Sequence, residues 1–126
     1  MTDPIIKGRE IVAELNPNME EALDRRYGDL LPGVGEIFVR QFGAFYGREG
    51  LAMRDRYIAT IAACTALGGQ TKPQLKVNIA GARKAGLSRE EIAETILHTA
   101  LYGGMPAAVN ALNAALEVFE EEGKSE

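Results

Sequence analysis

Cysteine and histidine are nearly absent from this chain of 126 residues, since each occurs only once. A single cysteine, Cys64, cannot form an intramolecular disulfide or a Cys-x-x-Cys redox pair, and it cannot supply a cysteine-rich zinc site. We expect Cys64 to be a small, inert core residue. The single histidine, His98, lies in the segment HTALYGGMPAAVNAL at residues 98–112.

The chain also lacks an excess of positive charge. Its 14 Lys and Arg residues stand against 18 Asp and Glu residues, and the basic residues are scattered singly or in pairs. Nucleic-acid binding needs a basic patch or stripe, so we expect no nucleic-acid partner. The apolar runs are much shorter than the roughly 20 residues that span a bilayer, and the N-terminus has no signal-peptide pattern. We therefore expect a cytoplasmic protein with no membrane partner.

Strand-like alternation is almost absent, and helical periods take its place. The length suits one compact domain with its own core. The sequence therefore predicts a single all-α domain over residues 1–126, a bundle of about six to seven helices. The helices are expected at residues 4–15, 18–30, 34–47 and 54–69, then from Thr71 to a stop at Gly86, from Ser88 to the Gly103-Gly104 pair, and from Pro106 into an acidic, frayed tail.

Local signals refine this prediction for the second half of the chain. Thr71-Lys-Pro-Gln74 and Ser88-Arg-Glu-Glu91 both fit capping boxes. The helix at residues 54–69 is apolar all round after its first turn, which is typical of a helix surrounded by protein. The last helix is nearly apolar apart from Asn110 and Asn113, which predicts burial within the subunit or against a second one. We expect the amides of Asn110 and Asn113 to have hydrogen-bond partners in the core or in an interface.

The helix that carries His98 has two distinct sides. At 100° per residue, one side is apolar and the other is polar. Glu94, His98 and Tyr102 follow one another at spacings of four, so a carboxylate could fix the imidazole tautomer beside a phenol. The trio is either a proton-transfer site or an ordinary solvated face, and spacing alone leaves both open. The apolar side carries Ile92, Ile96, Leu97 and Ala100; the polar side carries Glu91, Glu94, Thr95, His98, Thr99 and Tyr102.

Two further groups are candidates for binding. The first is the charged start of the helix at residues 54–69, which carries Arg54, Asp55 and Arg56. These residues either cap the helix and form salt bridges there, or one of the arginines binds a substrate carboxylate in a bidentate pair. Asn78 falls on the packing side of its helix, where an amide would need hydrogen-bond partners.

Two long segments carry a resemblance to a known family. FGAFYGREGLAMRDRYIATIAACTALGG at residues 42–69 and PQLKVNIAGARKAGLSREEIAETILHTALYGGMPAAVNAL at residues 73–112 resemble the carboxymuconolactone decarboxylase family, related to the alkylhydroperoxidase D-like proteins. The resemblance covers about residues 20–120. It implies an all-α fold, assembly as a homohexamer or homotrimer, and the use of no metal or organic cofactor.

For the chemistry, the resemblance implies either decarboxylation of a carboxylated lactone or thiol-dependent peroxide reduction. The redox cysteines of the peroxidase branch would fall at Thr71 and Gln74, so the chain lacks them. In the decarboxylase branch, Arg56 matches the family's arginine and suits a carboxylate anchor. His98 with Glu94 suits the acid that protonates carbon, and Tyr102 could donate to the lactone oxygen.

Two positions depart from the decarboxylase pattern. Asn78 stands where a histidine is usual, and Tyr57 stands where an acidic residue usually follows the arginine. An amide donates a hydrogen bond but does not shuttle a proton near neutral pH. The sequence therefore predicts either a cofactor-free decarboxylase, or a related enzyme acting on another small carboxylated lactone or 3-oxo acid, or a non-catalytic oligomeric member of the family.

Overall fold

The computed structural model describes residues 3–125, and every regular element within this range is a helix. The all-α prediction is therefore confirmed. The helices divide into two compact units, the first ending at Ala52 and the second beginning at Met53. The expectation of a single domain stays a prediction. No helix among the described residues is long and apolar enough to cross a membrane.

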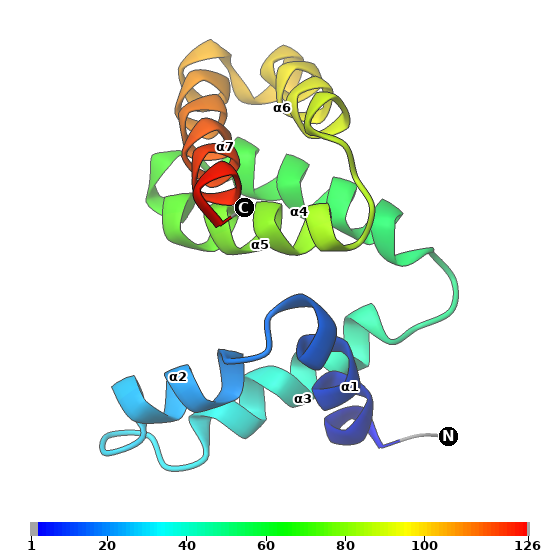
Figure 1. The fold of residues 1–126 in the computed structure, drawn as a ribbon, viewed down its shortest axis with the longest axis vertical. Coiled ribbons are helices and arrows are strands. Elements are labelled where there is room, and N and C mark those ends of the chain that lie inside the picture. Colours follow the sequence, from blue (N-terminus) through cyan, green and yellow to red (C-terminus); the bar gives the residue numbers. More distant parts are fainter. Residues whose placement is uncertain (1–2, 126) are drawn as a thin grey trace. The chain divides into compact units, whose positions relative to one another are not determined.

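The first unit consists of α1 (Pro4–Leu15), α2 (Met19–Tyr27) and α3 (Val34–Tyr46), with α3 packed against the other two (Figure 1). Asp3 caps α1 by accepting a hydrogen bond from the amide of Ile5 at 2.9 Å. Gly8 and Gly43 let the backbones of α1 and α3 approach so closely that a Cβ at either would collide with the facing backbone. The small core beside them contains Ile5, Val12 and Val39.

The second unit consists of α4 (Met53–Leu67), a short 3-10 helix η1 (Gly69–Thr71), α5 (Lys72–Lys84), α6 (Arg89–Gly103) and α7 (Met105–Ser125). α4 and α7 each pack against α5 and α6, and they also contact each other. Figure 1 shows α4 and α5 as one antiparallel pair and α6 and α7 as another. The fully buried core side chains include Ile61, Ile79, Leu87, Ile92 and Ile96.

The register of α4 against α6 is fixed at both ends. The side chain of Arg54 pairs with Glu91 at the start, and the backbone of Gly103 approaches that of Ala66 at the end. Residues of α4 therefore lie level with residues 37 positions later on α6, since both pairs differ by 37 (91 − 54 and 103 − 66). The two helices run in the same direction.

Helix boundaries agree with the prediction within a few residues, but two terminal details are wrong. Thr71 makes no capping hydrogen bond to α5, because its hydroxyl donates to the carbonyls of Cys64 and Gly68 at 2.6 and 2.9 Å. The acidic tail is helical through Ser125. Arg83 and Arg89 both pair with Glu122, at 3.1 and 3.3 Å, and these pairs hold the last turns of α7.

The expectation that α4 is surrounded by protein is also wrong for this chain. Only Tyr57, Ile61 and Thr65 are buried on α4, so one face packs and the other is open. Small alanines make the open face look apolar in sequence without requiring burial. The second capping box is confirmed, since the hydroxyl of Ser88 accepts from the amide of Glu91 at 3.0 Å and the Glu91 carboxylate accepts from the amide of Ser88 at 2.9 Å.

Candidate functional site

The predicted trio of Glu94, His98 and Tyr102 lies along one side of α6. All three side chains are exposed, and that of Tyr102 is 89% exposed. No hydrogen bond joins Glu94 to His98, or His98 to Tyr102, in the described part of the chain. The helix therefore brings the three groups to one surface without locking them together.

The buried side of α6 differs from the predicted one by a rotation of the helix. Ile92, Ile96 and Thr99 are buried, whereas Leu97 is 54% exposed. Thr99, expected on the polar side, satisfies its hydroxyl by donating to the carbonyl of Thr95 at 2.9 Å. Because the buried stripe follows positions 92, 96 and 99, the helix presents Leu97 and His98 on its open surface.

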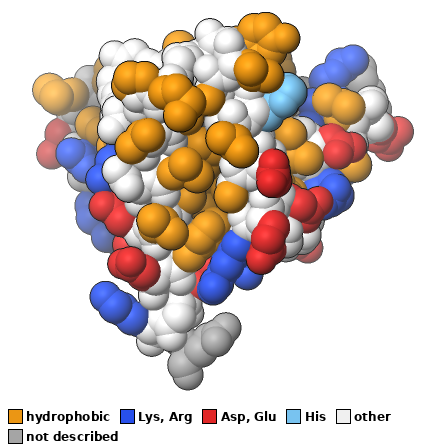
Figure 2. Space-filling model, turned by 90° about the horizontal axis from the view of Figure 1, so that it is seen from above, with side chains coloured by type: hydrophobic (Ala, Val, Ile, Leu, Met, Phe, Trp, Pro, Cys, Tyr) orange, Lys and Arg blue, Asp and Glu red, His pale blue; other side chains and the backbone are white. Residues whose placement is uncertain are grey.

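Exposed apolar side chains lie on α6, which carries His98, and on the two helices that pack against it. Leu97, Leu101 and Tyr102 come from α6, Met105 and Val109 come from α7, and Leu67 comes from the level end of α4; all are at least 50% exposed. We call this set the apolar end of the second unit. Figure 2 shows hydrophobic side chains gathered on this face with the histidine in pale blue beside them. Monomeric proteins rarely expose such contiguous patches without a partner.

The arginines at the start of α4 have different surroundings. Arg54 forms an ion pair with Glu91, which raises the pKa of the Arg54 guanidinium. The amide of Ser88 and the guanidinium of Arg54 both hold the pKa of the Glu91 carboxyl below its ordinary value. The salt-bridging interpretation is therefore confirmed for Arg54. Arg56 is half-buried, with its Nε atom buried.

The register of the two helices places Arg56 relative to the trio. Arg56 lies level with Ala93, next to Glu94, whereas His98 lies five residues further along α6. Five residues correspond to about 7.5 Å along a helix axis. Arg54 faces α6, and because successive helical residues turn by 100°, Arg56 starts from another side of α4, about 200° further round.

The two departures from the family pattern have structural settings of their own. Asn78 is half-buried, and its amide donates to the carbonyl of Gln74 on its own helix at 2.8 Å. Tyr57 is 2% exposed and packs against Gly81, where a Cβ would lie 2.7 Å from the Tyr57 hydroxyl oxygen. Tyr57 is therefore a core residue of the contact between α4 and α5.

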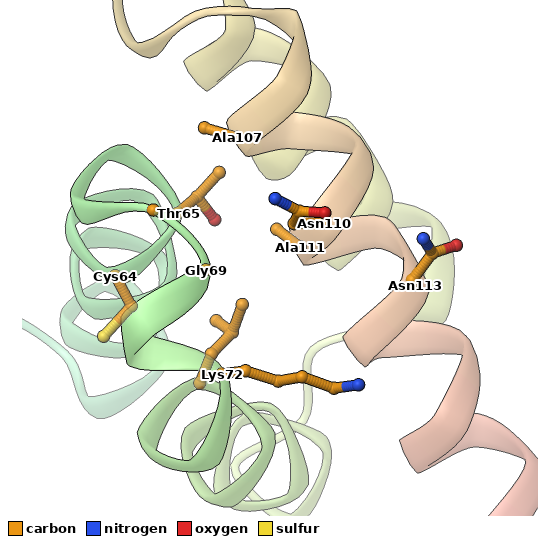
Figure 3. Close-up of a pocket in the computed structure, with 10 residues that line it drawn as sticks. Cys64, Thr65, Gly69, Lys72, Ala107, Asn110, Ala111 and Asn113 are labelled. Atoms are coloured by element: carbon orange, nitrogen blue, oxygen red, sulfur yellow. The ribbon is translucent and has the colours of Figure 1, made fainter.

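Two cavities lie elsewhere in the second unit. One, of about 230 Å³, lies between the end of α4, η1, the start of α5 and α7 (Figure 3). The other, of about 590 Å³, is an open groove between α5 and α7 beside Lys76 and Val77. Neither cavity is lined by any of the predicted site residues, which are Glu94, His98, Tyr102, Arg56 and Asn78.

The remaining candidates for chemistry are the Cys64 thiol and any cluster of metal-ligating side chains. Cys64 is half-buried, and burial raises the pKa of its thiol, so the nucleophilic thiolate is disfavoured near neutral pH. Its partial exposure at the smaller cavity differs from the expected position in the core. Within residues 3–125, no three His, Cys, Asp or Glu side chains gather in a group that could hold a metal ion.

Comparison with known proteins shows the family to which this chain belongs. The model of the carboxymuconolactone decarboxylase family matches residues 32–117, which include α3 to most of α7. The chain belongs to this family. The matched range contains Arg56, Asn78, Glu94, His98 and Tyr102, so every predicted site residue lies within the family region.

Two relatives of this family member are similar over much of its length. A 15.0 kDa protein in the nqo9-nqo10 intergenic region of Paracoccus denitrificans, described as uncharacterized, is 36% identical over 116 residues, which cover 91% of this chain and 87% of the relative. The 4-carboxymuconolactone decarboxylase of Acinetobacter baylyi is 35% identical over 88 residues, which cover 68% of this chain and 64% of the relative.

Sequence reasoning missed the smaller cavity. Asn110 and Asn113 were expected to be satisfied core or interface amides, yet both are exposed in the chain and line this cavity with Lys72. Contact with a second subunit stays a prediction. The available signal was the pair of polar residues at spacing three on an otherwise apolar helix, opposite the Gly68-Gly69 turn.

Proposed function

We propose that this protein is a cofactor-free lyase of the carboxymuconolactone decarboxylase type, acting in the cytoplasm on a small carboxylated lactone or 3-oxo acid from aromatic-compound breakdown. The observation that carries the proposal is the placement of Glu94, His98 and Tyr102 on one open face of α6 beside the apolar end. Family membership and the relative named as a decarboxylase support the same chemistry.

Each group has a role that decarboxylation requires. Loss of carbon dioxide leaves electron density that spreads into a conjugated carbonyl, so a site needs an anchor for a carboxylate, an oxyanion donor and an acid. Arg56 anchors the carboxylate, Tyr102 donates to the carbonyl oxygen, and His98 protonates carbon. Glu94 lies one helical turn before His98, and in this proposal the two side chains, which form no hydrogen bond in the isolated chain, pair once water is excluded.

Self-association completes the site in this proposal. An exposed imidazole and phenol would be screened by water, which weakens their electrostatic effect on a substrate. A second copy seated on the apolar end would exclude water from the face that carries His98. We therefore propose that the protein works as a homotrimer or homohexamer, with the face of α6 covered in the assembly.

Asn78 bears on which substrate is used. Its amide donates to the Gln74 carbonyl and cannot act as a general acid or base near neutral pH, so we propose that the native protein acts weakly on 4-carboxymuconolactone. We expect Asn78→His to gain release of carbon dioxide from this lactone, because it restores the histidine usual in the family. A folded, oligomeric Asn78→His protein that releases no more than the native protein would show that Asn78 is not the limiting difference.

A non-catalytic role in binding or assembly is the second candidate. The observation that favours it is the absence of His98, Glu94 and Arg56 from the lining of both described cavities. In this case the apolar end serves assembly alone, and the polar side of α6 is a solvated surface.

Measurement of carbon dioxide release separates the two candidates. The native protein is offered a panel of lactone acids and 3-oxo acids, and the best substrate is repeated with His98→Ala and Glu94→Gln. We expect His98→Ala to lose about 10²- to 10⁴-fold in rate, the usual contribution of a general acid, with unchanged helical content and assembly. Glu90→Gln, an exposed change on the same helix, is the matched control and keeps the native rate. No release above buffer from any substrate, or an active His98→Ala, contradicts the enzyme proposal.

A further inference from the structure

The smaller cavity of the second unit has an apolar floor and a polar rim. Leu75, Ala107 and Ala111 supply apolar surface, and Leu75 and Ala111 are themselves buried. Its volume of about 230 Å³ lies just below the roughly 300 Å³ at which pockets for drug-sized ligands begin. The cavity therefore suits a smaller molecule with one apolar and one polar end.

The two amides on the rim are available to a ligand. Asn110 and Asn113 form no hydrogen bond within the described residues, although the amide of Asn78 on α5 does bond to its own helix. Figure 3 shows the Asn110 side chain directed across the cavity toward Thr65. The Thr65 hydroxyl already donates to the carbonyl of Ile61 at 2.7 Å, so toward the cavity it can act only as an acceptor. Neither side-chain nitrogen, that of Asn110 or that of Asn113, donates to an acceptor within the described residues.

Lys72 adds a positive charge that can change partners. Its ammonium lies 3.0 Å from Glu117, and Lys76 lies 3.4 Å from the same carboxylate. A ligand carboxylate could thus take Lys72 without leaving Glu117 unpaired, because Lys76 stays with it. Both side chains of the Lys72 pair are nearly half exposed, so little desolvation opposes the exchange.

Two glycines keep the wall of the cavity free of side chains. Gly68 has φ of 95°, a conformation that L side chains rarely adopt. A Cβ at Gly69 would lie 3.5 Å from the Asn110 amide nitrogen, next to the donors on the rim. A larger side chain at Gly69 would therefore occupy the space that a ligand needs.

We propose that this cavity binds a small carboxylate with an apolar body, whose carboxylate accepts hydrogen bonds from Asn110 and Lys72 and whose body contacts Leu75, Ala107 and Ala111. The site is separate from the proposed decarboxylation site, because His98, Glu94 and Arg56 do not line it. A positive charge and an amide donor on the same cavity match the oxygen acceptors of a carboxylate.

Titration of the full-length protein with benzoate, followed by the side-chain amide signals of Asn110 and Asn113 in NMR spectra, tests this site. We expect a saturable shift of the Asn110 signal at up to tens of millimolar benzoate, a smaller shift of the Asn113 signal, and much weaker shifts with benzamide, which lacks the charge. Asn110→Ala and Lys72→Gln should each weaken binding by about tenfold, the loss of one charge-assisted hydrogen bond. Lys124→Gln, which removes an exposed ammonium near the end of α7 that does not line this cavity, should bind benzoate within about twofold of the native protein.

A variant that fills the cavity tests whether the ligand binds inside it. Gly69→Leu should abolish the saturable shifts, whereas Gly123→Leu, at a helical position with open space around it, should preserve them. His98→Ala should bind benzoate as the native protein does, which separates this site from the decarboxylation proposal. Non-saturable shifts, equal shifts with benzamide, or unchanged binding in folded Gly69→Leu would each overturn the proposal.

Discussion

At the scale of single residues, two acidic side chains of α6 differ in whether they have protein partners. The Glu91 carboxylate interacts with the amide of Ser88 and the guanidinium of Arg54. Glu94, three residues later on the same helix, has an exposed carboxylate. The same helix thus uses one acidic side chain to fix its start and leaves another beside His98. The first role is structural, and the second is the one that we propose for catalysis.

The held carboxylate predicts a pH-dependent stability. Its pKa is lower in the folded chain than the ordinary value near 4.5, so the Glu91 charge stabilises the fold above that value. The contribution is lost as the pH falls through the lowered folded value. Glu91→Gln keeps the capping geometry but removes the charge, so we expect a lower melting temperature than the native protein at pH 7 and a smaller difference near pH 3.

Thermal unfolding between pH 3 and pH 7 measures this effect. Glu90→Gln is the matched control, because Glu90 lies in the same first turn and forms no ion pair in the described part of the chain. An equal difference between native and Glu91→Gln proteins at both ends of the pH range would contradict the assignment.

At the scale of helices, the sequence predicted where helices begin and end better than it predicted which side of a helix is buried. Capping signals and glycines are local, so the limits of α1 and the start of α6 could be predicted closely. The rotation of α6 could not, because Leu97 and Thr99 exchange their expected environments according to which stripe meets α4 and α7. The hydroxyl of Thr99 satisfies itself on the helix backbone, which makes its burial inexpensive. The cavity at Asn110 requires knowledge of how three helix ends meet, which no local pattern contains.

Close packing of α4 on α5 makes a second prediction at this scale. A Cβ at Gly81 would lie 2.7 Å from the hydroxyl oxygen and 3.0 Å from ring carbons of Tyr57, which is buried. We expect Gly81→Ala to destabilise the protein by about 1–3 kcal/mol through overpacking, even though alanine is the better helix former. Gly123→Ala, which meets open space on α7, should be neutral or stabilising by up to about 1 kcal/mol. Urea unfolding measures both, and equal effects of the two substitutions would disprove the packing explanation.

At the scale of the whole molecule, the apolar end links the family fold to the proposed chemistry. Its side chains are exposed in the isolated chain, and they lie on the same face as the residues proposed to act. We therefore expect the native protein to be an oligomer in solution. Leu101→Glu, at a side chain that is 74% exposed, should raise the dissociation constant of the assembly by more than about tenfold while the subunit stays folded.

Light scattering and circular dichroism together check this expectation. Lys124→Glu introduces the same acidic group at an exposed position near the end of α7 and should leave the assembly intact. A native protein that is monomeric at micromolar concentration, or a Leu101→Glu protein that assembles as the native protein does, would show that the apolar end is not the interface.

The most direct test of the central claim is the specific activity of the native protein across a dilution series that passes through dissociation of the assembly. The substrate is the lactone or 3-oxo acid that gives the fastest release of carbon dioxide. We predict that activity per subunit falls as the assembly dissociates, and that Leu101→Glu shows the low value at all concentrations, because the face carrying Glu94, His98 and Tyr102 needs a second copy to exclude water. Activity per subunit that is the same in monomer and assembly would contradict the claim.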